Sequence, residues 1–274
     1  MTCYKGIAAY GDAPGDLAPA IFLITAIGTI SAYSFSLLGR VCSYNSARTF
    51  SDAWNKSIGS STFWIPATCG IFDGFIGNVA YSMILADTFK SLLATIGFYT
   101  SRSVVLLGIT ILVLVPLTLR KSSLSAFSFL GVLGMIYTVA AMAIRYFEGA
   151  YAFPSGRFLS DISAKLQPSF GLDGAQHKLI PNVFILICRL STAFNLHFNG
   201  PKFFNELNNN TISRFHTVVF ISFGIAMLVF MGIACFGFLT FGSACSGLIL
   251  NNYSANDALM GFSRLTVATS ILFS

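Results

Sequence analysis

The sequence predicts an all-α fold, a polytopic membrane helix bundle of about seven spans. Of the 274 residues, 55% are hydrophobic and only 9% are charged, and the mean hydropathy is +0.74. A soluble domain carries about 25% charged residues, so this chain has too few to cover a water-facing surface. Its apolar residues come in long runs that do not alternate with polar ones, which favours spanning helices over the strands of a membrane barrel.

A helix needs roughly 20 apolar residues to cross the hydrocarbon core of a bilayer. We expect one helix in each of seven runs: residues 17–39, 63–89, 103–119, 124–146, 179–200, 215–243 and 257–274. Residues 1–16 form a polar N-terminal stretch, and residues 17–274 are expected to form one partial transmembrane domain. The last run stops without a polar flank, so we expect the chain to be a piece of a longer protein.

The Lys and Arg residues of the short loops predict the orientation, because such residues concentrate on the cytosolic side. The 40–62, 120–123 and 201–214 loops hold seven: Arg40, Arg48, Lys56, Arg120, Lys121, Lys202 and Arg214. The opposite side holds three: Lys5, Lys90 and Arg102. The first set is therefore predicted to be cytosolic, and the glycosylation triplet that begins at Asn252 falls on the outer or lumenal side.

Composition and motifs exclude several classes of function. The net charge of +6 comes from residues in loops, and no basic stripe with interleaved aromatics suggests nucleic-acid binding. No GxSxG, P-loop or HExxH pattern occurs, and the six cysteines form no CxxC pair. We therefore expect no catalytic residues and no bound cofactor; the bilayer and a small solute are the expected partners.

The stretch "STAFNLHFNGPKFFNELNNN" places polar residues and a Gly200-Pro201 pair at the end of an apolar run. Gly and Pro interrupt the hydrogen-bond ladder of a helix, and membrane proteins tolerate an interruption where it lines a watery cavity. Asn195 and His197 are therefore candidate cavity residues, since transporters bind solutes at broken helices. In the plainer interpretation, Gly200-Pro201 ends the span at the cytosolic surface and His197 is a packing residue.

Two charged residues lie near the middle of predicted spans, Asp73 in 63–89 and Arg189 in 179–200. Charges at that depth are costly and usually face the bundle interior, where they pair. We expect Asp73 and Arg189 to pair or share a cavity, the alternative being separate polar partners. Asn78 joins Asn195 and His197 as a candidate substrate contact, although the sequence alone leaves its role open.

The last run carries the hydroxyl residues Thr269 and Ser270. Hydroxyl groups in a spanning helix commonly bond back to carbonyls of their own helix, which is the plainer interpretation. They can also offer oxygen ligands to Na⁺, so we keep both residues as possible Na⁺ contacts.

Three stretches resemble the amino acid/auxin permease family: "TFSDAW" at 49–54, "HFNGPKFFNEL" at 197–207 and "SRLTVATSILFS" at 263–274. The sequence is similar to the sodium-coupled neutral and the vacuolar amino acid transporters of that family. The resemblance implies a leucine-transporter-type fold of two inverted five-helix repeats, of which 17–274 cover the second to eighth helices. The family's first helix, which holds the substrate's α-carboxylate and α-amine, would be absent.

This resemblance implies secondary active transport of amino acids by alternating access, coupled to Na⁺ or H⁺, in the plasma membrane or in the vacuole or lysosome. Residues 179–207 would be the family's sixth helix, which places Asn195 and His197 near the central cavity. The eighth helix would offer Thr269, Ser270 or Ser274 to Na⁺ in sodium-coupled members.

Two alternatives remain at this point. Seven spans with an external N-terminus also describe a G-protein-coupled receptor, but no Asp/Glu-Arg-Tyr triplet follows the third span and no Asn-Pro-x-x-Tyr occurs in the seventh. The other alternative is a truncated fragment that does not transport.

Overall fold

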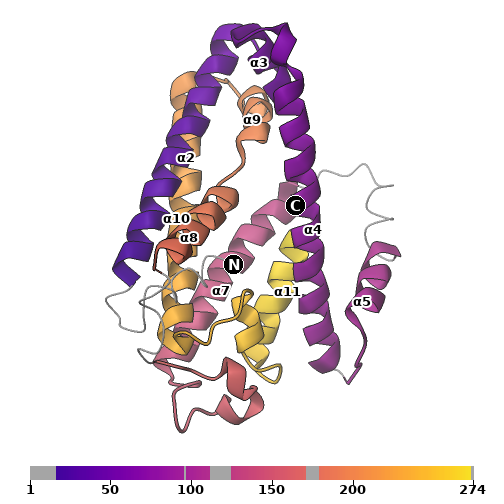
Figure 1. The fold of residues 1–274 in the computed structure, drawn as a ribbon, viewed down its shortest axis with the longest axis vertical. Helices are drawn as coiled ribbons and strands as arrows, with labels where there is room; N and C mark the ends of the chain where they lie inside the picture. The colour runs from indigo at the N-terminus through magenta and orange to yellow at the C-terminus, as the bar shows by residue number, and fades with distance from the viewer. Residues whose placement is uncertain (1–16, 96, 112–124, 171–178, 273–274) are drawn as a thin grey trace. The chain divides into compact units, whose positions relative to one another are not determined.

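The computed structural model describes residues 17–95, 97–111, 125–170 and 179–272, and this part of the chain is helical with no named strand (Figure 1). The prediction of an all-α fold is confirmed. Its longer helices are α2 (Leu17–Asn45), α3 (Phe50–Ser57), α4 (Trp64–Thr95), α5 (Arg102–Ile109), α7 (Ser125–Phe147), α8 (Leu179–Ala193), α9 (Gly200–Glu206), α10 (Ile212–Phe241) and α11 (Ala258–Leu272). Short 3₁₀ turns are η2 (Ser60–Thr62), η4 (Leu159–Asp161), η5 (Ala164–Leu166), η7 (His197–Asn199) and η8 (Ile249–Asn252).

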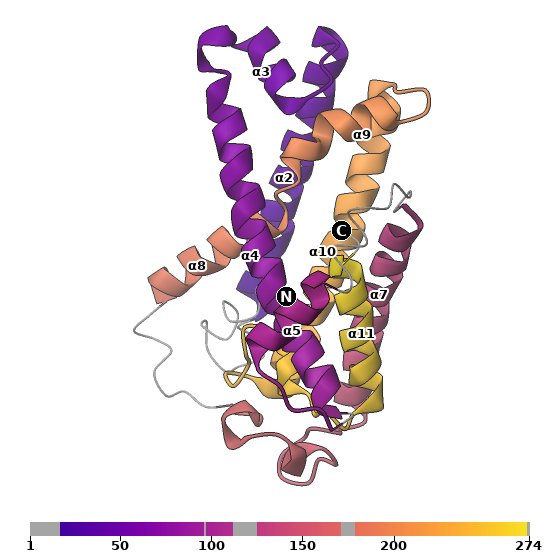
Figure 2. The ribbon, with the colours of Figure 1, turned by 90° about the vertical axis from the view of Figure 1, so that its right-hand side faces the viewer.

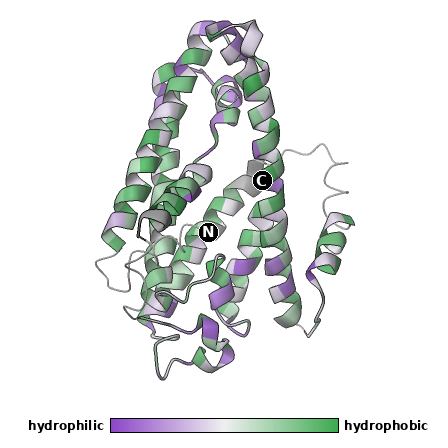
Figure 3. Ribbon diagram, viewed as in Figure 1, coloured by the Kyte–Doolittle hydropathy of each residue, from purple (hydrophilic) through white to green (hydrophobic). Residues whose placement is uncertain are grey.

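Within the described residues, four helical stretches have the length and apolar character needed to cross a bilayer: Leu17–Asn45, Ser60–Ala94, Phe129–Phe147 and Ile212–Phe241. Hydrophobic residues cover these helices along their length (Figure 3). Large apolar side chains are left exposed on them, among them Phe72 at 63% and Leu228 at 68%, as expected for surfaces that face lipid. Of the predicted 103–119 run, α5 accounts for the first part, and residues 112–124 lie outside the described residues.

The described helices cluster into two compact units. Unit A comprises residues 18–77 and 183–231 and holds α2, α3, α9, the first half of α4 and most of α8 and α10. Unit B comprises the described residues among 78–182 and 232–272, with Leu17, and holds α5, α7, α11 and the remaining parts of α4 and α10. Each unit has its own packing.

Unit A is built around Phe35 of α2, which is 4% exposed. Its ring stacks on Phe215 of α10 at 5.9 Å between centroids and lies 5.7 Å from the rings of Phe223 and His197. Aromatic pairs at such distances add to the free energy gained by apolar burial. Helix α3 lies across the ends of α2 and α4 (Figure 2), and its side-chain N-cap, Thr49, accepts a hydrogen bond from Asp52 N.

Unit B is organised by the packing of α7 against α11. The helices approach closely because Gly131 and Gly134 of α7 face Ser270 and Thr266 of α11; a Cβ on either glycine would come within 2.7 Å of the facing side chain. A groove of about 380 Å³ runs along the contact, lined by Leu, Phe and Tyr side chains together with glycines and the hydroxyl residues of α11.

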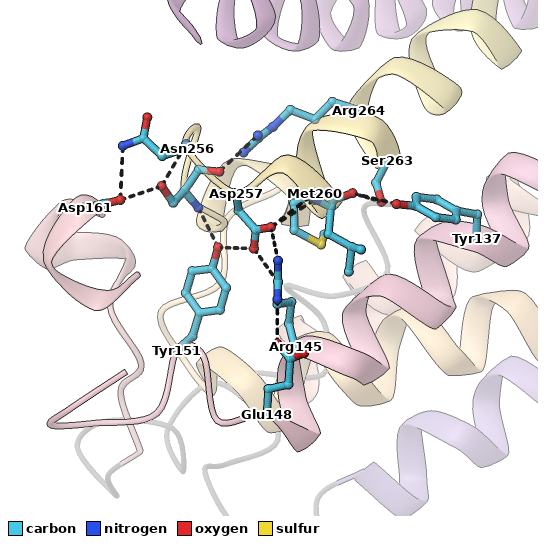
Figure 4. A network of polar contacts seen from close by, with 12 residues as sticks. Tyr137, Arg145, Glu148, Tyr151, Asp161, Asn256, Asp257, Met260, Ser263 and Arg264 are labelled. Atoms are coloured by element: carbon cyan, nitrogen blue, oxygen red, sulfur yellow. Dashed lines mark hydrogen bonds and ion pairs between the residues drawn. The ribbon is translucent and has the colours of Figure 1, made fainter. Parts of the chain in front are cut away.

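A buried ion pair joins the end of α7 to the start of α11 (Figure 4). Arg145 donates from Nε and Nη2 to the two carboxylate oxygens of Asp257, at 2.8 and 2.7 Å. Asp257 is fully buried and also accepts from the backbone N–H of Leu259, so it caps α11. Tyr151 donates to Asp257 Oδ2 at 3.0 Å; burial and the nearby carboxylate raise the pKa of Tyr151, so the phenol stays protonated.

Arg264 of α11 holds the loop that precedes its own helix. Its Nη atoms donate to the carbonyl oxygens of Leu250, Tyr253 and Ser254 at 2.7–3.2 Å, and the residue is 3% exposed. These carbonyls belong to a loop with no regular ladder, so the guanidinium supplies the donors that the buried backbone requires. The two arginines together fix the loop between α10 and α11.

Asn252 belongs to the same loop and is fully buried. Its Nδ2 donates to Leu166 O at 3.2 Å and to Ala244 O at 3.0 Å, and its Oδ1 accepts from Ser246 N at 2.8 Å. Nδ2 is the atom that would carry an N-linked glycan, and here both of its protons are used in hydrogen bonds.

We therefore predict that the folded protein carries no glycan on Asn252, although the residue begins an acceptor triplet. The measurement is the electrophoretic mobility of the protein from a glycosylating host, before and after treatment with peptide-N-glycosidase. No shift is expected. A shift that is lost in Asn252→Gln would show that the loop is open when it meets the oligosaccharyltransferase.

Gly242 ends α10 in a left-handed conformation, with φ of +56°. An added Cβ would lie 2.2 Å from the carbonyl oxygen of Ser169, which pairs with this turn through a hydrogen bond from Ser243 N at 3.0 Å. Only glycine combines this φ with so close a backbone approach.

We predict that Gly242→Ala lowers the free energy of unfolding by more than the roughly 1–2 kcal/mol that a left-handed non-glycine residue costs, because the clash adds to it. Thermal unfolding in detergent micelles measures the effect. The matched control is Gly224→Ala within α10, where an added Cβ meets nothing within 4 Å; equal melting temperatures for the two variants would contradict the prediction.

Candidate functional site

The candidate site is an interruption between α8 and α9 in unit A, seen in Figure 1 as the chain that connects the two helices. Helix α8 ends at Ala193, residues 194–196 are not helical, and the 3₁₀ turn η7 leads into α9 at Gly200. Tighter bonds replace the α-helical ladder there: Asn195 N donates to Thr192 O at 3.2 Å and Asn199 N to Leu196 O at 3.0 Å. Such irregular backbone is tolerated at membrane depth only where protein or a water-filled cavity surrounds it.

Asn195, the middle residue of the interruption, bonds to α4. Its Nδ2 donates to Asp73 Oδ1 at 3.1 Å. An amide donor to a carboxylate makes a charge-assisted hydrogen bond, which is stronger than a neutral one. Two of the residues singled out in the sequence are thus brought together, although the predicted partner of Asp73 was Arg189.

His197, the first residue of η7, bonds to α2. Its Nε2 lies 2.7 Å from Ser34 Oγ, and Ser34 in turn lies 3.0 Å from the carbonyl oxygen of Ser31. The imidazole ring packs edge-on against Phe35. His197 is therefore half-buried at the interruption with one ring nitrogen engaged.

Gly200 and Pro201 start a helix in the structure. Both residues are buried, and Pro201 occupies the first turn of α9, where its missing N–H costs nothing. A Cβ on Gly200 would lie 2.5 Å from Leu38 Cδ2, so glycine lets α9 approach α2 closely. Asn205 of α9 also bonds to the segment after α2, because its Nδ2 donates to Ala47 O at 3.0 Å. The Gly-Pro pair predicted the interruption of the helical hydrogen-bond ladder at residues 200–201. The structure places it earlier, at residues 194–196.

The other candidates lie elsewhere. Arg189 is half-buried on α8, and its pairing with Asp73 stays a prediction. Asn78 is an exposed residue of α4 that clusters with unit B. Thr269 Oγ1 donates to Leu265 O at 2.7 Å, as the plainer interpretation expects, and Ser270 lies against Gly131 of α7. Both hydroxyl residues line the α7–α11 groove of unit B.

The arrangement at the interruption suits a polar zwitterion. Asp73 of α4 supplies a carboxylate that bonds to Asn195, and His197 supplies an imidazole that bonds to Ser34 of α2. Both lie at backbone groups that the helical ladder leaves free. Carboxylate and carbonyl oxygens accept from an ammonium group, whereas free N–H groups at a broken helix donate to a carboxylate. No group of three or more His, Cys, Asp or Glu side chains fit to hold a metal ion occurs among the described residues.

Comparison with known proteins identifies the family. Residues 9–274, almost the whole chain, match the family described as transmembrane amino acid transporter protein. The chain belongs to this family. Its membership explains why no enzyme motif was found, and it decides against the receptor alternative.

Curated relatives agree with the family assignment. Solute carrier family 38 member 8 of Mus musculus is 24% identical over 92% of this chain, and vacuolar amino acid transporter 2 of Saccharomyces cerevisiae is 26% identical over 75%. Sodium-coupled neutral amino acid transporter 7 of Homo sapiens is 25% identical over 82%. The chain covers 57%, 42% and 50% of these three proteins, so it spans about half the length of the curated relatives it matches. No solved structure matches the chain.

Proposed function

We propose that the protein carries amino acids across a membrane by alternating access, coupled to an ion gradient of Na⁺ or H⁺. The observation that carries the proposal is the interruption between α8 and α9, where Asn195 and His197 are held by Asp73 and Ser34 in an otherwise apolar span. Discontinuous spanning helices of this kind form the solute sites of secondary transporters. The relatives, whose names specify amino acid transport, point to the same solute class.

In this proposal Asn195 and His197 contact the amino acid, and Asn78 is a further candidate contact from α4. Asp73 holds Asn195 in place, and its carboxylate balances the substrate's ammonium group. If the coupling ion is Na⁺, Thr269 and Ser270 of α11 are the candidate oxygen ligands. The membrane is the plasma membrane or that of the vacuole or lysosome; the name of one relative specifies the vacuole.

Uptake of radiolabelled amino acids into proteoliposomes that contain the complete protein tests this function. Neutral amino acids are expected to accumulate above the level in protein-free vesicles, and collapse of the driving ion gradient should abolish accumulation. Replacing Na⁺ by choline at constant pH separates the two coupling ions. Vesicles that hold folded protein and show neither accumulation nor exchange of any amino acid would contradict the proposal.

A further inference from the structure

Ser34 determines which nitrogen of His197 is free. The Ser34 hydroxyl has one proton, and two acceptors lie within reach, Ser31 O at 3.0 Å and His197 Nε2 at 2.7 Å. Both contacts are satisfied together only if Ser34 donates to the Ser31 carbonyl and accepts from an Nε2–H of His197. The opposite arrangement, with Ser34 donating to Nε2, would leave the contact with Ser31 O unmade.

The same arrangement serves neutral and protonated imidazole alike. In the Nε2–H tautomer the proton stays on Nε2 and is donated to Ser34 Oγ, and only Nδ1 changes between a lone pair and a second proton. No hydrogen bond to α2 has to break when His197 gains or loses that proton. A histidine held in this way exchanges a proton without losing its position at the interruption.

His197 is half-buried beside aromatic rings, and burial disfavours its charged form. Packed around it are Phe35 of α2 and, through that ring, Phe215 and Phe223 of α10. The basic groups on α2 and α10 are Arg40, Arg214 and His216, of which Arg40 and His216 contact each other at 3.4 Å. On α4, Asp73 is bonded to Asn195. Among the described residues, no carboxylate hydrogen-bonds to His197, so the proton on Nδ1 is not locked in an ion pair.

We propose that His197 is the site of the coupling proton, taken up and released at Nδ1, and that Ser34 is a positioning residue that keeps Nε2 protonated. This inference rests on the proposed transport function and specifies its coupling ion as H⁺. One hydrogen-bonded chain, from His197 through Ser34 to the Ser31 carbonyl, thereby joins the α8–α9 interruption to α2 in both protonation states.

Nitrogen NMR of the protein labelled with [¹⁵N]histidine, in bilayers, tests the inference without any transport measurement. The signals that disappear in His197→Gln belong to His197. They are expected to show the Nε2–H tautomer alone at pH 8 and protons on both nitrogens at pH 5. Ser34→Ala should produce a mixture of tautomers at pH 8, and Ser34→Thr should restore the single one.

The matched control is Ser31→Ala, which keeps the backbone carbonyl that Ser34 uses and should leave the spectrum unchanged. An Nδ1–H tautomer in the native protein, or a spectrum of Ser34→Ala equal to the native one, would overturn the role of Ser34. An imidazole that stays neutral from pH 8 to pH 5 would overturn the proton site.

A second experiment measures the movement of protons during amino acid uptake, with a pH-sensitive dye enclosed in proteoliposomes. Native protein is expected to move protons together with the amino acid, and His197→Gln to move fewer protons per amino acid molecule that it takes up. Equal proton movement in both proteins would overturn the coupling role. A failure of the transport function is distinguishable, because the native protein would then take up no amino acid while its NMR titration proceeds as described.

Discussion

Arg145→Met is expected to lower the free energy of unfolding by about 3–5 kcal/mol, the cost of leaving one partner of a buried ion pair uncompensated. Asp257 is fully buried, and Arg145 supplies two of the hydrogen bonds to its carboxylate. In the variant, the Asp257 carboxylate keeps only the hydrogen bonds from the Tyr151 hydroxyl and from the backbone N–H groups at the start of α11 among the described residues. Chemical unfolding in mixed micelles, followed by intrinsic fluorescence, gives the free energy directly.

Two further variants make this prediction specific. In Arg145→Met/Asp257→Asn the amide oxygen still caps α11 and the amide nitrogen, in place of Oδ2, donates to the Tyr151 hydroxyl. No charge is then buried, so the double variant should be more stable than Arg145→Met alone. The exposed pair of Lys56 and Asp52 in α3 is the matched control, since Lys56→Met should cost about 1 kcal/mol or less. If Arg145→Met also lowered the free energy of unfolding by only about 1 kcal/mol or less, the claim that the buried ion pair stabilises the fold would be contradicted.

Asp73→Leu is expected to reduce amino acid uptake at least about tenfold. The substitution removes the carboxylate that accepts the hydrogen bond from Asn195, and a hydrogen bond to a charged group contributes about 1.5–3 kcal/mol. A difference of about 1.36 kcal/mol in the activation barrier changes a rate tenfold. Asp73 is exposed in the described structure, so its loss should affect uptake more than folding. Initial uptake rates, normalised to the amount of protein in the membrane, measure the effect.

Thr68→Val on the same helix is the matched control. Thr68 Oγ1 donates to the carbonyl of Trp64 in its own helix, and the substitution keeps the shape of the side chain. Its uptake should stay within about a factor of two of the native rate, because an exposed intrahelical hydroxyl contributes little. Undiminished uptake by Asp73→Leu would mean that the bond between α4 and the interruption plays no part in transport.

The helices were predictable from local sequence because run length and composition decide them. The 17–39 and 215–243 runs correspond to α2 and α10, whose ends differ from the expected ones by only a few residues. Helix α2 continues past the apolar run to Asn45, since Arg40 and its neighbours are compatible with a helix outside the hydrocarbon core.

The place of the interruption was predictable only in part. Gly200 and Pro201 drew attention to the correct stretch, because their backbone chemistry is visible in the sequence. The ladder ends earlier, at Ala193, where no strong helix breaker follows; contacts of Asn195 with Asp73 and of His197 with Ser34 hold the chain there. These partners are 122 and 163 residues away along the chain, beyond the reach of a local pattern.

The polar network of unit B was missed for a similar reason. Arg145 stands at the end of an apolar run and Asp257 at the start of another, where charged residues are ordinary flanks. Only the packing of α7 against α11 shows that they form a buried pair. Asn252 was noticed only as part of a glycosylation triplet, and its burial reverses the meaning of that motif.

The central claim is that an amino acid binds at the interruption between α8 and α9, and cysteine accessibility tests it most directly. Asn195→Cys is made in a background in which the exposed Cys69 and Cys188 are replaced by serine. The rate of its reaction with a small, water-soluble thiol reagent is then measured with and without amino acid in bilayers. We expect reaction in the absence of substrate and a several-fold slower reaction at saturating amino acid. A thiol that reacts at the same rate with and without a transported amino acid would contradict the claim.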